Sequence, residues 1–245
     1  MYEFYVFDFL ETVTDQLYQR LLEILHSPLD EQNLSRLGDF QNVNGSVHGV
    51  YLLHLDRNPI YVGKANNVRS RLTQHLNKLS GRQIEMQRIT FKAIILGRSM
   101  NTAANENLLM VHFRNQGMCG WNGLGFGSKD PGDKREDSAP SVFDLQFPIR
   151  RDFVLNSITD NENIGSALMK MKEELPFLLR WDRENLTPTE MAMPLNLEGC
   201  SRIATELLCA IAQALGTGWQ AVVFPSHMII YKNNVVYRHG ERIFH

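Results

Sequence analysis

The sequence predicts an α+β protein built from a first unit with the element order ββαβα and a second, smaller α/β unit. Short β-rich runs alternate with segments whose apolar residues recur at helical spacing. The hydrophobic fraction of 43% and the charged fraction of 21% are typical of globular proteins and exclude a disordered chain. For these 245 residues we expect a domain boundary near residue 150, with domains at 1–150 and 151–245.

The first 45 residues are expected to form a helical extension of the first unit. Pro28 ends this segment, because proline cannot continue a helix. The apolar residues with helical spacing are Val13, Leu17, Leu21, Ile24 and Leu25.

The ββαβα order begins with a hairpin, because two β-rich runs flank a turn around residues 56–58. A helix capped by Asn66 or Asn67 follows, then a third strand and a second helix. The Gly-, Asp- and Pro-rich stretch 117–140 is expected to be a long irregular loop. The strands are expected at 47–55, 59–63 and 89–96, the second helix at about 101–116, and the apolar stripe of the first helix at Val68, Leu72, Leu76 and Leu79.

The second unit, 151–245, is expected to combine helices with short strands. Pro176 must kink or end the first of its helices, and Asn233 and Asn234 form a turn between its last two strands. The helices are expected at 164–181 and 200–215, and the strands at 219–224, 228–232 and 235–237.

The charge is unevenly distributed along the chain. The net charge is −2, but the stretch from Lys64 to Lys92 holds seven Lys or Arg residues against one Glu, which leaves +6 there and −8 elsewhere. Such a stretch predicts a phosphate-binding face, and an ordinary solvated helix face remains the alternative. We expect Arg69, Lys78 and Arg82 to contact DNA from this stretch.

The sequence indicates a cytoplasmic protein without a membrane span. No apolar run approaches the roughly 18 residues that a span needs. The start of the chain holds three acidic residues up to Glu11 and no Lys or Arg, which is the wrong charge for a presequence. The three cysteines, Cys119, Cys200 and Cys209, lack C-x-x-C spacing, which argues against a disulfide framework or a structural zinc site.

Five polar positions stand out on this frame. Tyr51 and Tyr61 lie on the two strands of the hairpin, and Arg71 and His75 are four residues apart on one helix face, beside the apolar stripe. Glu106 lies at the start of the second helix. Taken singly, each has an ordinary interpretation, since tyrosines pack in strands and the helix dipole favours a first-turn Glu.

Taken together, their order and spacing resemble the GIY-YIG nuclease superfamily. The segments that match are Gly49-Val50-Tyr51, Tyr61-Val62-Gly63-Lys64, Arg71, His75, Glu106 and Asn122. The resemblance covers roughly residues 35–150 and implies a small antiparallel sheet in a ββαβα nuclease core. The loop segments Trp121-Asn122, Gly125-Phe126-Gly127, Pro131-Gly132 and Arg135 are similar to type II restriction endonucleases of this superfamily that cut a GC-rich palindrome. Residues 151–245 match no family that we recognise.

Cleavage of a phosphodiester needs an activated water and neutralisation of the charge that grows on the phosphate. Glu106 would hold one Mg²⁺ or Mn²⁺ ion, and Arg71 would bind the scissile phosphate. Tyr51 would orient or deprotonate the water, with Lys64 as the cation that lowers the pKa of Tyr51.

Three further residues have supporting roles. Tyr61 would hold the phosphate or share the proton relay, and His75 would bind the phosphate or relay a proton. The resemblance implies that Asn122 fixes the loop against the site by hydrogen bonds. Lys129, Lys134 and Arg135 lie on the loop that is expected to reach a groove of the DNA, where Arg is the best reader of guanine.

We therefore expect a metal-dependent endonuclease that acts on double-stranded DNA in restriction or anti-phage defence. One alternative is a partner-gated nuclease subunit of a multi-component defence or mobile-element system. Another is a DNA-binding protein without catalytic activity. Residues 151–245 are expected to mediate association, either as a homodimer or with a protein partner, because their apolar helices and strands must bury their surface.

Overall fold

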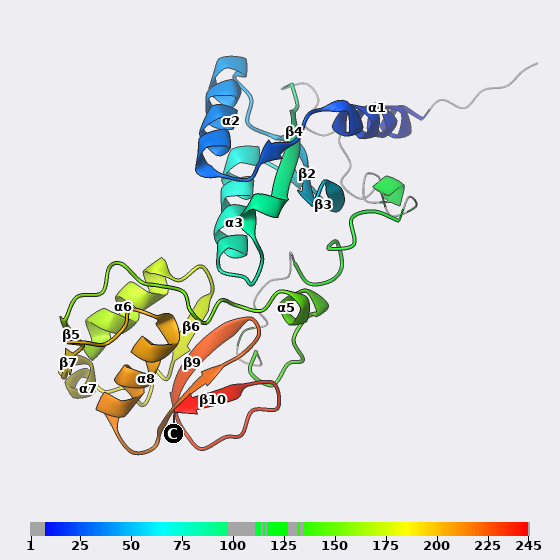
Figure 1. The fold of residues 1–245 in the computed structure, drawn as a ribbon. Coiled ribbons are helices and arrows are strands. Elements are labelled where there is room, and N and C mark those ends of the chain that lie inside the picture. The colour runs from blue at the N-terminus through cyan, green and yellow to red at the C-terminus, as the bar shows by residue number, and fades with distance from the viewer. Residues whose placement is uncertain are drawn as a thin grey trace, which may run out of the picture. The chain divides into compact units, whose positions relative to one another are not determined.

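The computed structural model describes residues 8–97, 111–113, 115, 117–126, 132 and 135–244 (Figure 1). The chain forms two compact units, the first from Met1–Asn77 and Glu85–Gly127 and the second from Lys78–Ile84 and Ser128–His245. The predicted domain boundary at residue 150 lies inside the second unit.

The first unit contains the small antiparallel sheet that the sequence predicts. Its strand order is β1-β4-β2-β3, and every neighbouring pair is antiparallel. The turn of the β2–β3 hairpin has positive φ at Asp56 and Arg57, as tight hairpin turns require. The strands are β1 (Ser27–Pro28), β2 (Gly49–Leu55), β3 (Asn58–Ala65) and β4 (Ile89–Ile95).

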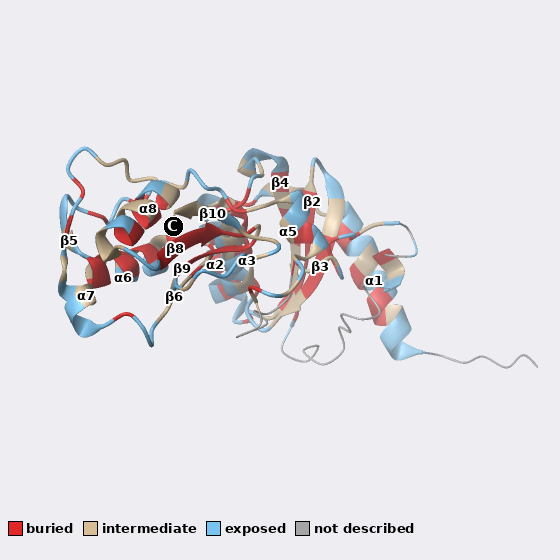
Figure 2. Ribbon diagram, turned by 90° about the horizontal axis from the view of Figure 1, so that it is seen from below, coloured by how far each residue is buried: buried red, intermediate tan, exposed pale blue. Residues whose placement is uncertain are grey.

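Helices cover both faces of this sheet (Figures 1 and 2). Helix α1 (Phe9–Glu23) packs its apolar stripe on one face, where Leu21 joins a buried cluster with Val50 and Leu52. Helices α2 (Glu31–Asn44) and α3 (Val68–Ser80) lie on the other side. The expected helical extension is thus two helices joined by β1, which pairs with the edge of β4.

Helix α3 largely follows its predicted pattern. The side chain of Asn67 accepts a hydrogen bond of 3.0 Å from the Ser70 amide, which is a capping interaction. Val68, Leu72 and Leu79 are fully buried, as their spacing predicts. A short 3-10 turn, η1 (Met86–Arg88), leads into β4.

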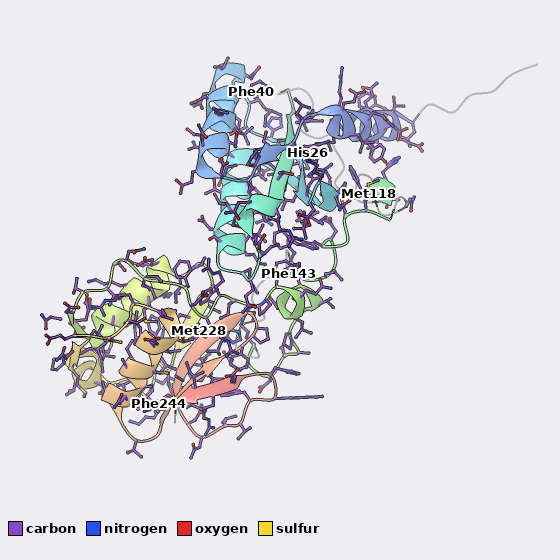
Figure 3. The ribbon with its side chains drawn as sticks, in the orientation of Figure 1. His26, Phe40, Met118, Phe143, Met228 and Phe244 are labelled. Atoms are coloured by element: carbon purple, nitrogen blue, oxygen red, sulfur yellow. The ribbon has the colours of Figure 1, made fainter. Side chains whose placement is uncertain are left out.

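The second unit is built around a sheet of order β10-β8-β9-β6, in which β6 and β9 are parallel. Met228 on β9 and Phe244 on β10 lie in this unit, and β8 and β9 are buried along most of their length (Figures 2 and 3). A smaller sheet pairs β5 with β7. The elements are α5 (Val142–Gln146), β5 (Asn161–Asn163), α6 (Ile164–Glu174), β6 (Leu178–Trp181), α7 (Pro188–Ala192), β7 (Pro194–Asn196), α8 (Ala204–Leu215), β8 (Trp219–Val223), β9 (His227–Lys232) and β10 (Glu241–Phe244).

Two predictions for this unit are corrected in part or in full. The expectation that Pro176 kinks or ends the first helix is confirmed, because the helix ends at Glu174, but its predicted extension to residue 181 is wrong. Pro176 disfavours helical geometry at Leu175, and the chain continues as strand β6. The strand expected at 235–237 is absent from the described residues. The side chain of Asn233 accepts a hydrogen bond from the Val235 amide and turns the chain, so that the strand forms later, as β10.

No helix in the described ranges combines the length and the apolar character that a membrane span requires.

Candidate active site

The two tyrosines lie on one face of the first unit's sheet. Tyr51 on β2 is opposite Gly63 on β3, and Leu53 is opposite Tyr61, so the tyrosines are diagonal neighbours. Their ring centroids are 6.2 Å apart. A Cβ at Gly63 would lie 2.4 Å from the Tyr51 hydroxyl oxygen, which excludes any side chain larger than glycine. Gly63 therefore makes room for Tyr51, and this explains the glycine two residues after Tyr61.

His75 meets both tyrosines from helix α3. Its Nε2 lies 2.8 Å from the Tyr51 hydroxyl, within hydrogen-bond distance. Its ring centroid is 5.5 Å from that of Tyr51 and 5.4 Å from that of Tyr61. His75 was expected beside the apolar stripe, but its side chain is buried, whereas that of the stripe residue Leu76 is only partly buried.

Arg71 completes the group one helical turn before His75. Its guanidinium donates a hydrogen bond of 2.9 Å to Oε1 of Gln74. Burial alone lowers the pKa of Arg71, but hydrogen bonds and Coulomb attraction from Tyr51 and Tyr61 outweigh it and raise the pKa above its usual value. Arg71 therefore holds a permanent positive charge beside the two hydroxyl groups.

Lys64 does not share this face. It pairs with Val50 across the hairpin, whereas Tyr51 pairs with Gly63. Because side chains alternate along a strand, Lys64 lies on the opposite face of the sheet from Tyr51. The cation that contacts Tyr51 is Arg71, and the role predicted for Lys64 is corrected accordingly.

Asn122 makes the hydrogen bonds that we expect of it. Its amide is buried, accepts a bond of 2.8 Å from the Val62 N–H and donates one of 2.8 Å to the Val62 carbonyl. Strand β3 is at the edge of the sheet, so these backbone groups have no strand partner on that side. The Asn122 amide thus replaces a neighbouring strand and attaches the following segment beside the tyrosines.

Phe126 is a member of the site that the sequence analysis named only as part of a loop segment. Its buried ring stacks on His75, with centroids 4.9 Å apart and planes at 20°. It also packs against the Tyr61 ring in a T-shaped arrangement, with ring centroids 5.1 Å apart. The spacing of Phe126 from the strands carries no periodic signal, which is why pattern analysis gives it no role.

The residues predicted to contact DNA have different surroundings. Arg69 is exposed, Arg135 is half-buried, and Lys78 lies 5.4 Å from the centroid of the Phe143 ring. Arg82 is 4% exposed and pairs with Asp144 at 2.8 Å, so the prediction of an exposed DNA-binding cation is wrong. The predicted basic face is also reduced elsewhere, as Arg88 pairs with Asp56 and the buried Lys92 donates to the Leu22 carbonyl.

Three predicted site residues, Glu106, Lys129 and Lys134, lie outside the described residues. Within the described part of the chain, no group of three or more His, Cys, Asp or Glu side chains could hold a metal ion. The described side chains of the site supply a cation, hydroxyl groups and an imidazole.

A small antiparallel sheet that presents two tyrosines to an arginine and a histidine has the groups needed to bind a phosphate and move a proton. Such a set of groups suits an enzyme that cleaves phosphodiesters. A family model described as the GIY-YIG catalytic domain matches residues 47–107. The match of residues 47–107 to this catalytic domain indicates an endonuclease, a phosphodiester hydrolase, and implies DNA as its substrate. No curated protein matches the chain.

Proposed function

We propose that this endonuclease is metal-dependent, acts on double-stranded DNA and serves in restriction or anti-phage defence. The observation that carries the cleavage chemistry is the 2.8 Å contact between Tyr51 and His75 beside the charged Arg71. The restriction role is supported by the segments around Trp121 and Arg135, which resemble the loop of restriction enzymes in this superfamily.

Arg71 binds the scissile phosphate in this proposal. Its planar guanidinium can donate two parallel hydrogen bonds to phosphate oxygens, and its charge opposes the charge that develops in the transition state. Tyr61, on the same face as Tyr51, adds a hydroxyl donor to the phosphate. Gln74 orients the guanidinium from the next turn of helix α3.

Tyr51 and His75 move the proton of the attacking water. The Tyr51 hydroxyl proton passes to Nε2 of His75 as the Tyr51 oxygen accepts a proton from the water. Arg71 stabilises the negative charge that the Tyr51 oxygen gains between these transfers. The water oxygen then attacks phosphorus, and the bond from phosphorus to the leaving oxygen breaks. The leaving oxygen takes up a proton from solvent, and His75 returns the proton it gained to solvent.

Glu106 is the residue that we assign to the metal. A single carboxylate, completed by water and phosphate oxygens, suits Mg²⁺ or Mn²⁺. The bound ion would supply further neutralisation of the charge on the phosphate and its leaving oxygen.

A plasmid-nicking assay tests the function. We expect the protein to nick supercoiled DNA with Mg²⁺ and not with EDTA, and we expect Glu106→Gln to cut several orders of magnitude more slowly, by loss of the metal's charge stabilisation. Glu85→Gln removes a carboxylate from the exposed surface and is the control. Mg²⁺-dependent cutting at full rate by Glu106→Gln would contradict the metal assignment, and binding without cutting by the wild type would indicate a DNA-binding protein.

The biological role needs a second readout. Discrete fragments from a large phage DNA indicate a restriction enzyme, whereas cutting that appears only with a second protein indicates a partner-gated subunit. Light scattering of the full-length protein tests whether 151–245 mediates association. A truncation at residue 150 is unsuitable for this purpose, because it would cut through the second unit.

A further inference from the structure

Phe126 is placed against His75 by two sets of contacts. The Trp121 amide donates to the Ile60 carbonyl at 2.8 Å, and Asn122 bonds to Val62, so the segment before Phe126 is attached to the edge of β3. The Trp121 ring then contacts the Phe126 ring, with centroids 4.9 Å apart. Phe126 is 1% exposed, so its ring is surrounded on all sides.

His75 needs such a support, because a histidine can turn about its Cα–Cβ and Cβ–Cγ bonds. Turning would move Nε2 away from the Tyr51 hydroxyl and break the 2.8 Å contact. Phe126 covers one face of the imidazole, with the planes only 20° from parallel. Tyr61 meets the imidazole at 64°, an edge contact that limits rotation in the other direction.

We propose that Phe126 is a positioning residue that holds the imidazole of His75 in line with Tyr51 for proton transfer. The role rests on the proposed function, because it acts on the same relay. Phe126 has no polar atom, so it takes no part in the chemistry and acts through His75. Its flat face sets the imidazole plane, and an aliphatic side chain of similar volume fills the space without setting that plane.

The test compares single-turnover rates of plasmid nicking, with enzyme in excess, and DNA dissociation constants. We expect Phe126→Leu to cut about 10- to 100-fold more slowly, a range set by the cost of small misplacements of reacting groups, and to bind DNA as the wild type does. Phe126→Tyr keeps the flat ring and should recover most of the rate. Phe126→Met, with a more flexible side chain, provides a second aliphatic variant if Phe126→Leu does not fold.

Two controls separate positioning from general stability. Leu21→Ala removes fully buried side-chain volume that packs on the opposite face of the same sheet. It should lower thermal stability at least as much as Phe126→Leu does, without slowing DNA cleavage. In a His75→Ala background, Phe126→Leu should cause no further loss, since its effect passes through His75.

The positioning role is overturned if Phe126→Leu cleaves at the full rate. It is also overturned if Phe126→Leu slows the His75→Ala variant as much as it slows the wild type. Loss of the proposed function gives another pattern, in which the wild type does not cut or His75→Ala cuts at full rate, and the positioning role then fails with the relay. A wild type that cuts, a slow His75→Ala and an unaffected Phe126→Leu would reject the role of Phe126 alone.

Discussion

Arg71 and Arg82 lie close in sequence, within and just after helix α3, and their surroundings are opposite. Arg71 is half-buried beside two hydroxyl groups and makes no ion pair with any carboxylate of the described residues. Arg82 is buried against Asp144 at 2.8 Å and donates to the carbonyls of Phe147 and Pro225 at 3.1 and 3.2 Å. Arg71 is available to bind a ligand, whereas Arg82 stabilises the fold.

The pKa values of the two arginines also move in opposite directions. Burial lowers the pKa of Arg82 despite the attraction of Asp144, whereas the tyrosine hydroxyls raise the pKa of Arg71. A cation that already has a carboxylate partner gains little from a phosphate. A cation beside neutral hydroxyls keeps its charge available for one. The comparison shows that a basic stretch of sequence is not a basic surface.

The largest effect on stability is expected for Arg82→Ala. The substitution leaves the largely buried carboxylate of Asp144 without its ion-pair partner, and we expect the free energy of unfolding to fall by about 3–5 kcal/mol. Arg88→Ala breaks an exposed pair with Asp56 in the same basic stretch and should cost far less, because water screens that pair. Urea denaturation measures both, and equal losses would contradict the distinction between the two pairs.

Arg71→Ala should show the reverse pattern. Cleavage should slow by about 10²–10³-fold, the typical cost of losing a transition-state donor, while thermal stability changes little. Arg69→Ala removes an exposed cation of the same helix and should weaken DNA binding and reduce its salt dependence by about one counterion, without a comparable loss of rate. Arg71→Lys should recover only part of the rate, because an ammonium lacks the planar fork. If Arg71→Ala and Arg69→Ala have the same effect, Arg71 is only a surface cation.

Strands, helices and the tyrosine pair could be predicted because they depend on local periodicity. The alternation of apolar residues identifies β2 and β3, and the turn between them fixes which residues face each other. The burial of Arg82 could not be predicted, because its partner Asp144 lies far away in sequence and belongs to no periodic pattern.

Two other findings have equally physical causes. Lys64 is adjacent in sequence to the Tyr61-Val62-Gly63 segment, but the alternation along β3 turns its side chain away from Tyr51. His75 was expected beside the apolar stripe, but its pattern does not show that the aromatic rings of Tyr61 and Phe126 enclose the imidazole. Contacts between rings from distant segments leave no signal in a single sequence.

Neutral hydrogen bonds from Asn122 attach its segment beside the site, whereas an ion pair between Arg82 and Asp144 fixes the segment after α3. Substituting Asn122 tests this difference. Asn122→Ala leaves the Val62 N–H and carbonyl without partners, and we expect a loss of about 1–3 kcal/mol in the free energy of unfolding. Asn44→Ala removes an exposed side chain that donates to the Phe40 carbonyl and should cost less than about 0.5 kcal/mol.

The loss in Asn122→Ala should not depend on salt, because no charge is involved. The loss in Arg82→Ala should depend on salt only weakly, because the pair is buried. Denaturation at low and at high ionic strength checks both expectations, and a marked salt dependence in Asn122→Ala would show that its amide is not what fixes the segment.

The effects of acid arise only below neutral pH, and they distinguish the two units by the pH at which each loses stability. In the first unit, burial, with the charges of His26 and Lys92, lowers the pKa of His54 to about 3. In the second, burial raises the pKa of Glu162, but hydrogen bonds from Lys170, Thr159 and Ser166 outweigh it and lower the pKa to about 2.

The sign of each effect follows from which state takes up the proton. Unfolded chains protonate His54 below its usual pKa of 6.5, while the folded unit resists protonation down to about 3, so the first unit loses stability as the pH falls from 6.5 towards 3. Glu162 stabilises the folded second unit above its usual pKa of 4.5, and that contribution disappears as the pH falls from 4.5 towards 2. Hydrogen exchange measured between pH 7 and 3 should therefore show the first unit opening before the second. His54→Gln should reduce the loss of stability between pH 6.5 and 3, and Glu162→Gln should reduce the loss between pH 4.5 and 2. If both units open together in both variants, the two groups do not control the acid response, and the units unfold as one.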